Sequence, residues 1–215
     1  MKNANRKYHQ LVLIWISDSA KYQEYLQKLR PIVARYGGKA DKVFQPISIW
    51  AEGLETPHMV NLVHYDSKKS FDEFRDDPDF KKIVHLRSAS IKMISFEGYL
   101  DVENPSSEGL KERMYNIELG YYKNGSPDAY RKYEAEGEKK MKEYGFDIEF
   151  VLAIEAKSAE ERQPDFAKIS YFKSATDKAN FEKDPMHKTI EEDLYPAAID
   201  NAIWISGKIH PMMLE

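Results

Sequence analysis

Residues 67–78, SKKSFDEFRDDP, recur as residues 174–185, SATDKANFEKDP. Both copies begin with Ser, carry Phe seven residues later and end in Asp-Pro, and every matched position is 107 residues from its counterpart. Each copy also follows an apolar run that ends in an aromatic residue, Tyr65 or Phe172. A fixed separation over several landmarks indicates an internal duplication.

The duplication extends beyond this stretch. At a separation of 108 residues, five further positions of the first half recur in the second: Tyr22, Tyr25, Tyr36, Gly37 and Val43 match Tyr130, Tyr133, Tyr144, Gly145 and Val151. Gly98 matches Gly207 at a separation of 109 residues. The one-residue drifts fall in predicted loops, where insertions are tolerated. We therefore expect two copies of one structural unit.

Each copy has the periodicity of a βαββαβ unit. The expected strands are 8–16, 43–50, 58–65 and 91–100 in the first copy, and 115–122, 148–156, 166–172 and 202–209 in the second. The expected helices are 20–36, 129–144 and one from each Ser-to-Pro stretch onward. Pro31 predicts a kink or break after Arg30, and each Asp-Pro predicts a helix break. The expected organisation is a first unit at 8–103, a linker at 104–114 and a second unit at 115–210.

A βαββαβ unit forms an antiparallel sheet with both helices on one face, so the other face needs a cover. The third strand of the first copy is apolar on both sides, because Val60 and Leu62 alternate with Met59 and Val63. Strands of this kind are buried on both faces. The predicted fold class is therefore α+β, with two tandem ferredoxin-like units packed sheet to sheet within one chain.

This arrangement resembles the dimeric α/β-barrel superfamily, here with its two ferredoxin-like units fused in tandem. The Ser-Phe-Asp-Pro stretch is similar to a signature of antibiotic-biosynthesis-type monooxygenases, NIPSNAP-like proteins and an uncharacterised bacterial family. In the last of these an Arg commonly follows the Pro, and Arg87 stands nine residues after Pro78, where the second copy has Leu194. The resemblance implies the barrel fold and a small-molecule pocket, but the fold hosts many activities.

The monooxygenase signature usually carries His before the Pro motif and again just after Pro. Here these positions hold Phe74 and Asp79, then Phe181 and Met186. Haem-binding relatives with two fused units use a proximal His in the second unit, where His187 is the one helical candidate. Neither type of chemistry therefore transfers directly, and we expect no cofactor.

Composition excludes several classes of function. The chain of 215 residues is 42% hydrophobic and 32% charged, as expected of a globular protein. Its net charge is −4 with dispersed Lys and Arg, which argues against nucleic-acid binding. It has no Cys, so disulfides, thiolate metal sites and a Cys nucleophile are excluded. The apolar run 11–16 is too short for a signal peptide or a membrane span, so we expect a cytoplasmic protein without a membrane partner.

His64 and Arg87 are the predicted catalytic residues. His64 ends a buried strand, where an imidazole can act as a general base or orient a substrate; the alternative is a hydrogen-bonded core histidine. Arg87 can hold a carboxylate with two hydrogen bonds; the alternative is a salt bridge to Asp76, Asp77 or Asp79. The second copy has Tyr171 and Leu194 in their places, which assigns any single active site to the first half.

Five residues are predicted to bind the ligand: Tyr65, Trp50, Asn61, Lys168 and Tyr171. Lys168 lies in an apolar strand, so either its strand end is solvated or, as we expect, it points into a wet cavity and meets an acid. Trp50 flanks a loop that forms either a lid or a solvated turn. A metal site is not expected, because His58 and His64 are six residues apart and His187 with Glu191 has no evident third ligand.

The leading functional hypothesis is a small-molecule-binding protein with cofactor-independent, oxygenase-like or isomerase-like chemistry on an apolar or aromatic carboxylated ligand. The competing hypothesis is a non-catalytic binding or assembly protein that forms homo-oligomers through its strand edges. A haem-binding relative is a remote third. Whether the protein is an enzyme stays open at this point.

Overall fold

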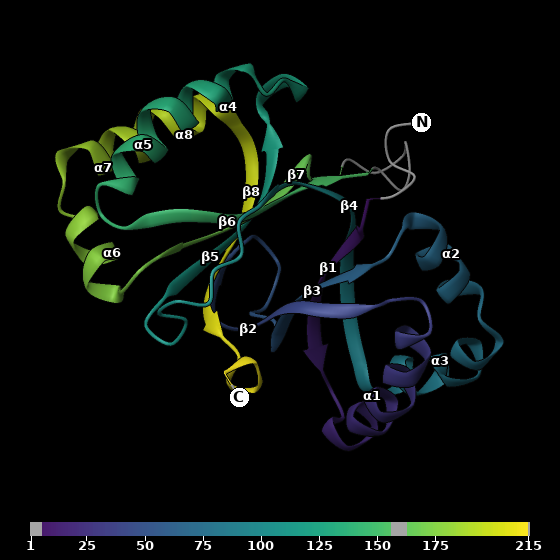
Figure 1. The fold of residues 1–215 in the computed structure, drawn as a ribbon. Coiled ribbons are helices and arrows are strands. Elements are labelled where there is room, and N and C mark those ends of the chain that lie inside the picture. The colour runs from purple at the N-terminus through teal and green to yellow at the C-terminus, as the bar shows by residue number, and fades with distance from the viewer. Residues whose placement is uncertain (1–5, 156–162, 215) are drawn as a thin grey trace. The chain divides into compact units, whose positions relative to one another are not determined.

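The computed structural model describes residues 6–155 and 163–214, which form two compact units (Figure 1). The first unit comprises residues 1–45 and 57–99, and the second comprises residues 46–56 and 100–215. Within the described residues, no helix is both long and apolar enough to cross a membrane.

The first unit has the predicted order βαββαβ. Its elements are β1 (Tyr8–Ile16), α1 (Ser19–Ala34), β2 (Lys39–Trp50), β3 (Met59–Tyr65), α2 (Lys68–Asp76), α3 (Pro78–Ser90) and β4 (Ile91–Glu103). The strands pair antiparallel in the order β4-β1-β3-β2. The three helices cover one face of this sheet (Figure 1).

The second unit repeats this plan. Its strands are β5 (Met114–Tyr122), β6 (Phe146–Ile154), β7 (Phe166–Phe172) and β8 (Ile199–Ile209), paired antiparallel in the order β8-β5-β7-β6. The helices are α4 (Asp128–Tyr133), α5 (Lys139–Lys142), α6 (Ala175–Phe181), α7 (Pro185–Thr189) and α8 (Tyr195–Ala198). Two π-helical turns, η2 (Glu134–Glu138) and η3 (Ile190–Leu194), interrupt them, and short 3-10 turns lie at η1 (Lys123–Gly125) and η4 (Pro211–Met213). The two sheets thus have the same strand order.

The repeated Asp-Pro pair starts a helix in each unit. Asp77 caps α3, because its Oδ1 accepts hydrogen bonds from the backbone N–H groups of Asp79 and Phe80, and Pro78 occupies the first turn. The hydroxyl of Tyr36 donates to Oδ2 of the same carboxylate over 2.7 Å. The shared Tyr and Asp-Pro positions are therefore parts of one structural clamp.

The second unit builds the same clamp. Asp184 caps α7 by accepting from the backbone N–H of Met186, and the hydroxyl of Tyr144 donates to its other oxygen over 2.6 Å. In both units the tyrosine precedes a glycine with positive φ, +67° at Gly37 and +74° at Gly145. Glycine reaches this conformation without steric cost, which explains why Tyr-Gly recurs with Asp-Pro.

Alternate residues of each central strand face the helices. In β1 and β3 these include Tyr8, Val12 and Tyr65, which pack with helix residues such as Phe71 and Phe74. The residues between them face away from the helices and are also buried, as Leu11, Leu13 and Val60 are fully buried. The prediction that the central strands are buried on both faces is confirmed.

Two local predictions need correction. Helix α1 runs to Ala34 with Pro31 inside it, so of the predicted kink or break after Arg30 the break is wrong, and the kink stays a prediction. A proline beyond the first turn removes a single N–H donor, and α1 continues past Pro31 without it. Strand β2 begins at Lys39, four residues earlier than predicted, because its polar start still pairs with β3.

Candidate functional site

His9, Asp41 and His64 form a cluster in the first unit, here called the histidine–aspartate cluster. His9 of β1 and His64 of β3 are direct cross-strand partners. Since directly paired residues project to the same side of a sheet, both imidazoles lie on the face turned away from the helices. Their ring centres are 5.9 Å apart.

Asp41 reaches this pair through a β-bulge. In β2, Ala40 pairs with Val63 and Lys42 pairs with Leu62, so Asp41 is an extra residue between two successive pairs. A bulge bends its strand and redirects the side chain of the inserted residue. The bulge thus adds a carboxylate to two imidazoles supplied by regular pairing.

The cluster is compact and mostly buried. Asp41 Oδ1 is 2.7 Å from His64 Nδ1, and Asp41 Oδ2 is 3.6 Å from His9 Nε2. The side chain of His9 is 2% exposed, while that of Asp41 is 22% exposed. Both nitrogens of His9 and Oδ2 of Asp41 are buried without a hydrogen-bond partner in the described residues. Such atoms are rare in proteins and call for an explanation.

Burial decides the protonation state of His9. It lowers the pKa of His9 to about 4, although the carboxylate of Asp41 acts in the opposite direction. His9 is therefore a neutral imidazole at neutral pH, and its unprotonated nitrogen offers a lone pair. Among the described residues, this is the one group of three His or carboxylate side chains whose ligand atoms all lie within 4.8 Å of one another.

The second unit builds a different site at the equivalent place, here called the arginine site. The paired positions hold Tyr115 and Tyr171, and the extra residue of the β6 bulge is Glu149, between Ile148 and Phe150. As in the first unit, a glycine lies on the other neighbouring strand: Tyr115 pairs with Gly207, as His9 pairs with Gly98.

Arg113 fills the arginine site. Its guanidinium carbon lies 3.8 Å from the ring centre of Tyr171, and its Nη1 is 3.6 Å from Glu149 Oε1. Further hydrogen bonds join Arg113 to the Tyr115 hydroxyl and to Ser106. The Arg113 and Glu149 side chains are 4% and 0% exposed. A permanent cation thus neutralises the carboxylate of the second copy.

Lys168 forms a second buried network on the helix-facing side of the second unit, here called the lysine network. Its ammonium lies 2.7 Å from Glu138, 2.9 Å from Glu118 and 2.5 Å from the hydroxyl of Tyr130. Tyr195 donates to Glu118 over 2.8 Å. The predicted meeting of Lys168 with an acid is confirmed, since it meets two, while the wet cavity stays a prediction.

The charges of this network stabilise one another. Burial alone disfavours the ammonium, but the carboxylate of Glu118, together with Glu138 and the surrounding tyrosines, outweighs it and raises the pKa of Lys168 well above its usual range. Glu138 ends the π-helical turn η2, and Tyr195 directly follows the π-helical turn η3. These turns shift the helix faces that carry the two side chains.

The structure separates the predicted site residues. His64 faces away from the helices, whereas Tyr65 lies in the helix-facing core and stacks on Phe74 with ring centres 5.4 Å apart. Arg87 belongs to α3, where it lies over the ring of Phe80 and interacts with the Tyr25 hydroxyl. His64 and Arg87 therefore do not share a pocket.

The other predicted residues are also dispersed. Trp50 is 69% exposed at the end of β2. Asn61 lies between Val60 and Leu62 in β3, and its buried Oδ1 has no hydrogen-bond partner in the described chain. Lys168 and Tyr171 lie on opposite faces of β7, in the lysine network and the arginine site. The alternative salt bridge of Arg87 is taken by another residue, because Arg35 pairs with both Asp77 and Asp79.

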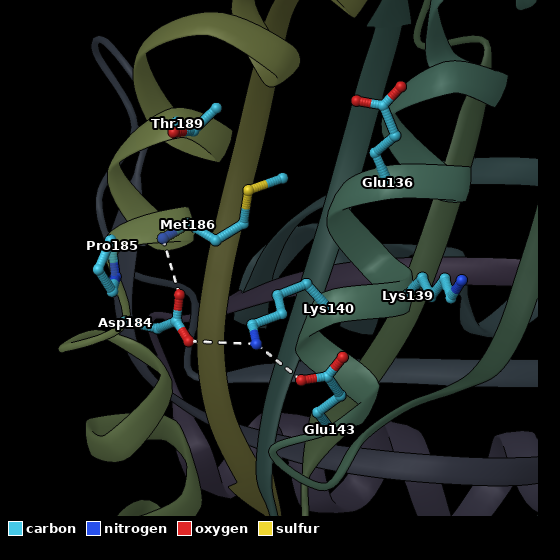
Figure 2. Close-up of a pocket in the computed structure, with 8 residues that line it drawn as sticks. All are labelled: Glu136, Lys139, Lys140, Glu143, Asp184, Pro185, Met186 and Thr189. Atoms are coloured by element: carbon cyan, nitrogen blue, oxygen red, sulfur yellow. Dashed lines mark hydrogen bonds and ion pairs between the residues drawn. The ribbon is translucent and has the colours of Figure 1, made fainter.

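A surface groove of about 540 Å³ lies at the Asp-Pro break of the second unit (Figure 2). Lys140 stands between two carboxylates, 2.7 Å from Glu143 and 3.4 Å from Asp184. A corresponding groove of about 710 Å³ lies at Asp77 and Pro78 of the first unit. At the centre of Figure 2, Lys140 pairs with Glu143 and Asp184, so these charges are already paired within the protein.

Sequence reasoning missed His9, Asp41, Arg113, Glu118 and Glu138. A signal for His9 exists, because the ferredoxin-like order places the first strand beside the third and brings two strand histidines into reach. No signal marks Asp41, whose position depends on the bulge. Arg113 fell within the predicted linker, which appeared uniformly polar.

Residues 9–99 match the domain of unknown function DUF1330. No protein with a curated description matches the chain. Among solved structures, an anthrone oxidase-like protein is 11% identical, with a TM-score of 0.60 over 95% of this chain and 92% of that chain. A chlorite dismutase variant from Candidatus Nitrospira defluvii is 9% identical, with a TM-score of 0.59 over 99% and 93%.

A proposed monooxygenase from Fusobacterium nucleatum is 9% identical, with a TM-score of 0.57 over 97% of this chain and 94% of that chain. At such identities the likeness establishes the fold and not the activity. Each match spans both copies. The chain has the dimeric α/β-barrel fold, with both ferredoxin-like halves in one polypeptide.

Proposed function

We propose that the protein is an enzyme that oxidises or oxygenates a small apolar or aromatic compound bearing a carboxylate or a phenolic hydroxyl group. The reaction centre is the histidine–aspartate cluster of the first unit. The observation that carries this proposal is the convergence of two imidazoles and a carboxylate, in which both nitrogens of His9 and Oδ2 of Asp41 are buried without a hydrogen-bond partner in the described residues.

The cluster has the character of a site rather than of a structural network. The carboxylate of the structural Asp77 clamp is saturated, since it accepts four hydrogen bonds, from the Tyr36 hydroxyl, the Arg35 guanidinium and two backbone N–H groups. The cluster instead keeps lone pairs on His9 and Asp41 without protein donors. Such lone pairs can take a proton from an acidic hydroxyl or carbon acid of a substrate. They can also hold a metal ion that polarises the substrate.

The fold neighbours support the class of reaction. Those reported above carry names that refer to oxidation, oxygenation or an oxyanion of chlorine. Part of the surroundings is apolar, since Leu11 and Leu62 lie two positions from the histidines on the same face of their strands and are buried; the buried Lys42 pairs with Leu62 across that face. An apolar body with one acidic group suits such a site.

The test is a melting-temperature screen of the full chain with aromatic carboxylates, fatty carboxylates and phenols, followed by oxygen-consumption assays of the hits. We expect ligands that raise the melting temperature of the wild type and of His85→Gln, an exposed-histidine control, but not of His64→Gln or Asp41→Asn. Circular dichroism of each variant checks folding.

Two outcomes would count against the proposal. Shifts that persist in both cluster variants would place the ligand elsewhere. A flat response across the whole library would favour the non-catalytic binding or assembly protein, whose strand-edge association stays a prediction that sedimentation analysis can check.

A further inference from the structure

We infer that the histidine–aspartate cluster binds one divalent transition-metal ion through His9, Asp41 and His64. This inference deepens the proposed function, because it rests on the same placement of the reaction centre. It requires no particular substrate.

The donor set fits this class of ion. Two imidazoles and one carboxylate favour Zn²⁺, Fe²⁺ or Co²⁺ over Mg²⁺ and Ca²⁺, which prefer oxygen ligands. The single negative charge partly neutralises a divalent ion. Three protein ligands leave coordination positions open for a substrate or an oxygen species, as in catalytic rather than structural metal sites.

The geometry needs only small adjustments. Ligands at about 2.1 Å from one ion lie roughly 3.0–3.4 Å from each other in octahedral or tetrahedral arrangements. The observed separations are 2.7 Å between Asp41 and His64 and 3.6 Å between Asp41 and His9, and every pair of ligand atoms lies within 4.8 Å. Rotations of three side chains bring these atoms to bonding distance of a common centre.

Burial of unpaired ligand atoms favours the binding of an ion. His9 Nε2 and Asp41 Oδ2 are buried without hydrogen-bond partners in the described residues. A metal ion accepts a lone pair from each of them and so offsets their loss of hydration. Asp41, at 22% exposure, gives solvent a way to the cluster, whereas His9 at 2% does not.

The second copy supplies an independent argument. At the equivalent place, Glu149 is accompanied by the guanidinium of Arg113. The first copy keeps the bulged carboxylate, but the residue two positions before His9 is the exposed Lys7. Where one copy carries a covalently attached cation, the other presents two metal-ligating imidazoles.

The test uses the full chain, stripped of metal with a chelator and titrated with Co²⁺. Visible absorption reports the ligand field, and native mass spectrometry reports the number of ions. We expect one ion per chain, with a ligand field of mixed nitrogen and oxygen donors. His9→Gln, Asp41→Asn and His64→Gln should each weaken binding by at least about 100-fold, the upper end of the loss seen when only the supporting shell is removed.

Two control variants exclude surface binding. His85→Gln removes an exposed histidine, and His187→Gln removes the surface pair with Glu191, where Nε2 and Oε1 are 3.3 Å apart. Both should bind Co²⁺ as the wild type does. A melting curve of each variant without metal separates lost binding from lost folding.

Two results would overturn the inference. One is a folded wild type that takes up no Co²⁺ or Zn²⁺; the other is binding that survives in the cluster variants and disappears in His187→Gln. Ligand-dependent melting shifts that persist in the metal-free protein would then leave the proposed function standing without a metal. Metal binding without any ligand response would fail the proposed function and leave this inference intact.

Discussion

On the first sheet, the paired positions His9 and His64 place two imidazoles beside a bulged aspartate. On the second sheet, the same paired positions hold Tyr115 and Tyr171, and the bulged residue is Glu149 beside Arg113. Both copies use the same strand pairing and the same β-bulge. In the first copy the side chains leave lone pairs without a hydrogen-bond partner in the described residues, whereas in the second copy Arg113 neutralises the carboxylate. One duplicated scaffold therefore carries the proposed reaction centre in one copy and a carboxylate paired with an internal cation in the other.

On the helix-facing sides of the two sheets, the second unit carries the more polar core. The second unit buries Lys168 with two glutamates, whereas the matching strand position of the first unit is Asn61 in a mainly apolar core. Buried ion networks contribute little net stability compared with apolar packing, but removing one member is costly. The second copy thus places its buried glutamates beside buried cations, whereas in the first copy buried atoms of the histidine–aspartate cluster and of Asn61 have no hydrogen-bond partner in the described residues.

The sharpest test of this difference is Lys168→Met. It leaves Glu118 and Glu138 buried without their cation, and we expect a loss of about 3–5 kcal/mol in the free energy of unfolding. Asn61→Leu at the matching position removes an amide with an unpaired oxygen and should change stability by less than about 1 kcal/mol. Chemical denaturation of both variants measures the contrast.

Charge neutralisation provides the control for Lys168→Met. Adding Glu118→Gln and Glu138→Gln to it should restore much of the stability, because the unpaired charges are then gone. Equal stability of wild type and Lys168→Met would show that the network is not energetically coupled.

The next largest effect is expected at the arginine site. Arg113→Met leaves the fully buried Glu149 without its cation and should cost about 3 kcal/mol. Lys7→Met, at the matching position of the first copy, changes an exposed residue and should stay within about 0.5 kcal/mol. Thermal unfolding followed by circular dichroism compares the two. A cost at Lys7 as large as that at Arg113 would contradict the assignment of different roles to these positions.

The glycines that follow Tyr36 and Tyr144 allow a finer comparison. Gly37→Ala should cost more than Gly145→Ala, although both residues have positive φ. A left-handed conformation costs a non-glycine residue roughly 1–2 kcal/mol. At Gly37 the added methyl group would also collide with the carboxylate of Asp66, whereas at Gly145 it would meet the flexible side chain of Lys173 at 3.4 Å. Urea denaturation measures the difference, and equal losses would show that Asp66 moves aside freely.

The sequence contained the fold because the duplication repeats its structural landmarks. Tyr36, Gly37 and Asp77-Pro78 recur in the second copy, and the structure shows that they form one clamp. The site was only partly predictable. His64 was a candidate from its strand position, but a one-residue bulge delivers Asp41, and bulges leave no composition signal.

Face assignment explains the remaining errors. His64 and Tyr65 are neighbours in sequence, and adjacent strand residues point to opposite sides of a sheet. Combining them with Arg87 in one pocket was therefore incompatible with strand geometry. Lys168 and Tyr171 are three residues apart and are separated in the same way. Strict use of the two-residue period would have divided the candidates into the two groups that the structure shows.

The smallest expected effects concern the clamps themselves. The Tyr36 hydroxyl, followed by the capping N–H groups, lowers the pKa of Asp77, and the Tyr144 hydroxyl likewise lowers the pKa of Asp184. A carboxylate whose pKa is lower in the folded state adds stability above its unfolded pKa, about 3.9, and loses it as the pH falls through the folded value. Tyr36→Phe and Tyr144→Phe should therefore destabilise the protein at neutral pH and approach the wild type in acid.

The two clamps should not respond equally. Without its tyrosine, Asp77 still accepts from Arg35 at 2.7 Å and from two backbone N–H groups, whereas Asp184 retains one backbone N–H and Lys140 at 3.4 Å. Tyr144→Phe should thus lower stability more than Tyr36→Phe. Urea denaturation of both variants from pH 7 to pH 3 measures the two differences. A gap from wild type that does not narrow with falling pH would mean that ring packing, and not the hydrogen bond to an ionised carboxylate, explains why the tyrosine recurs.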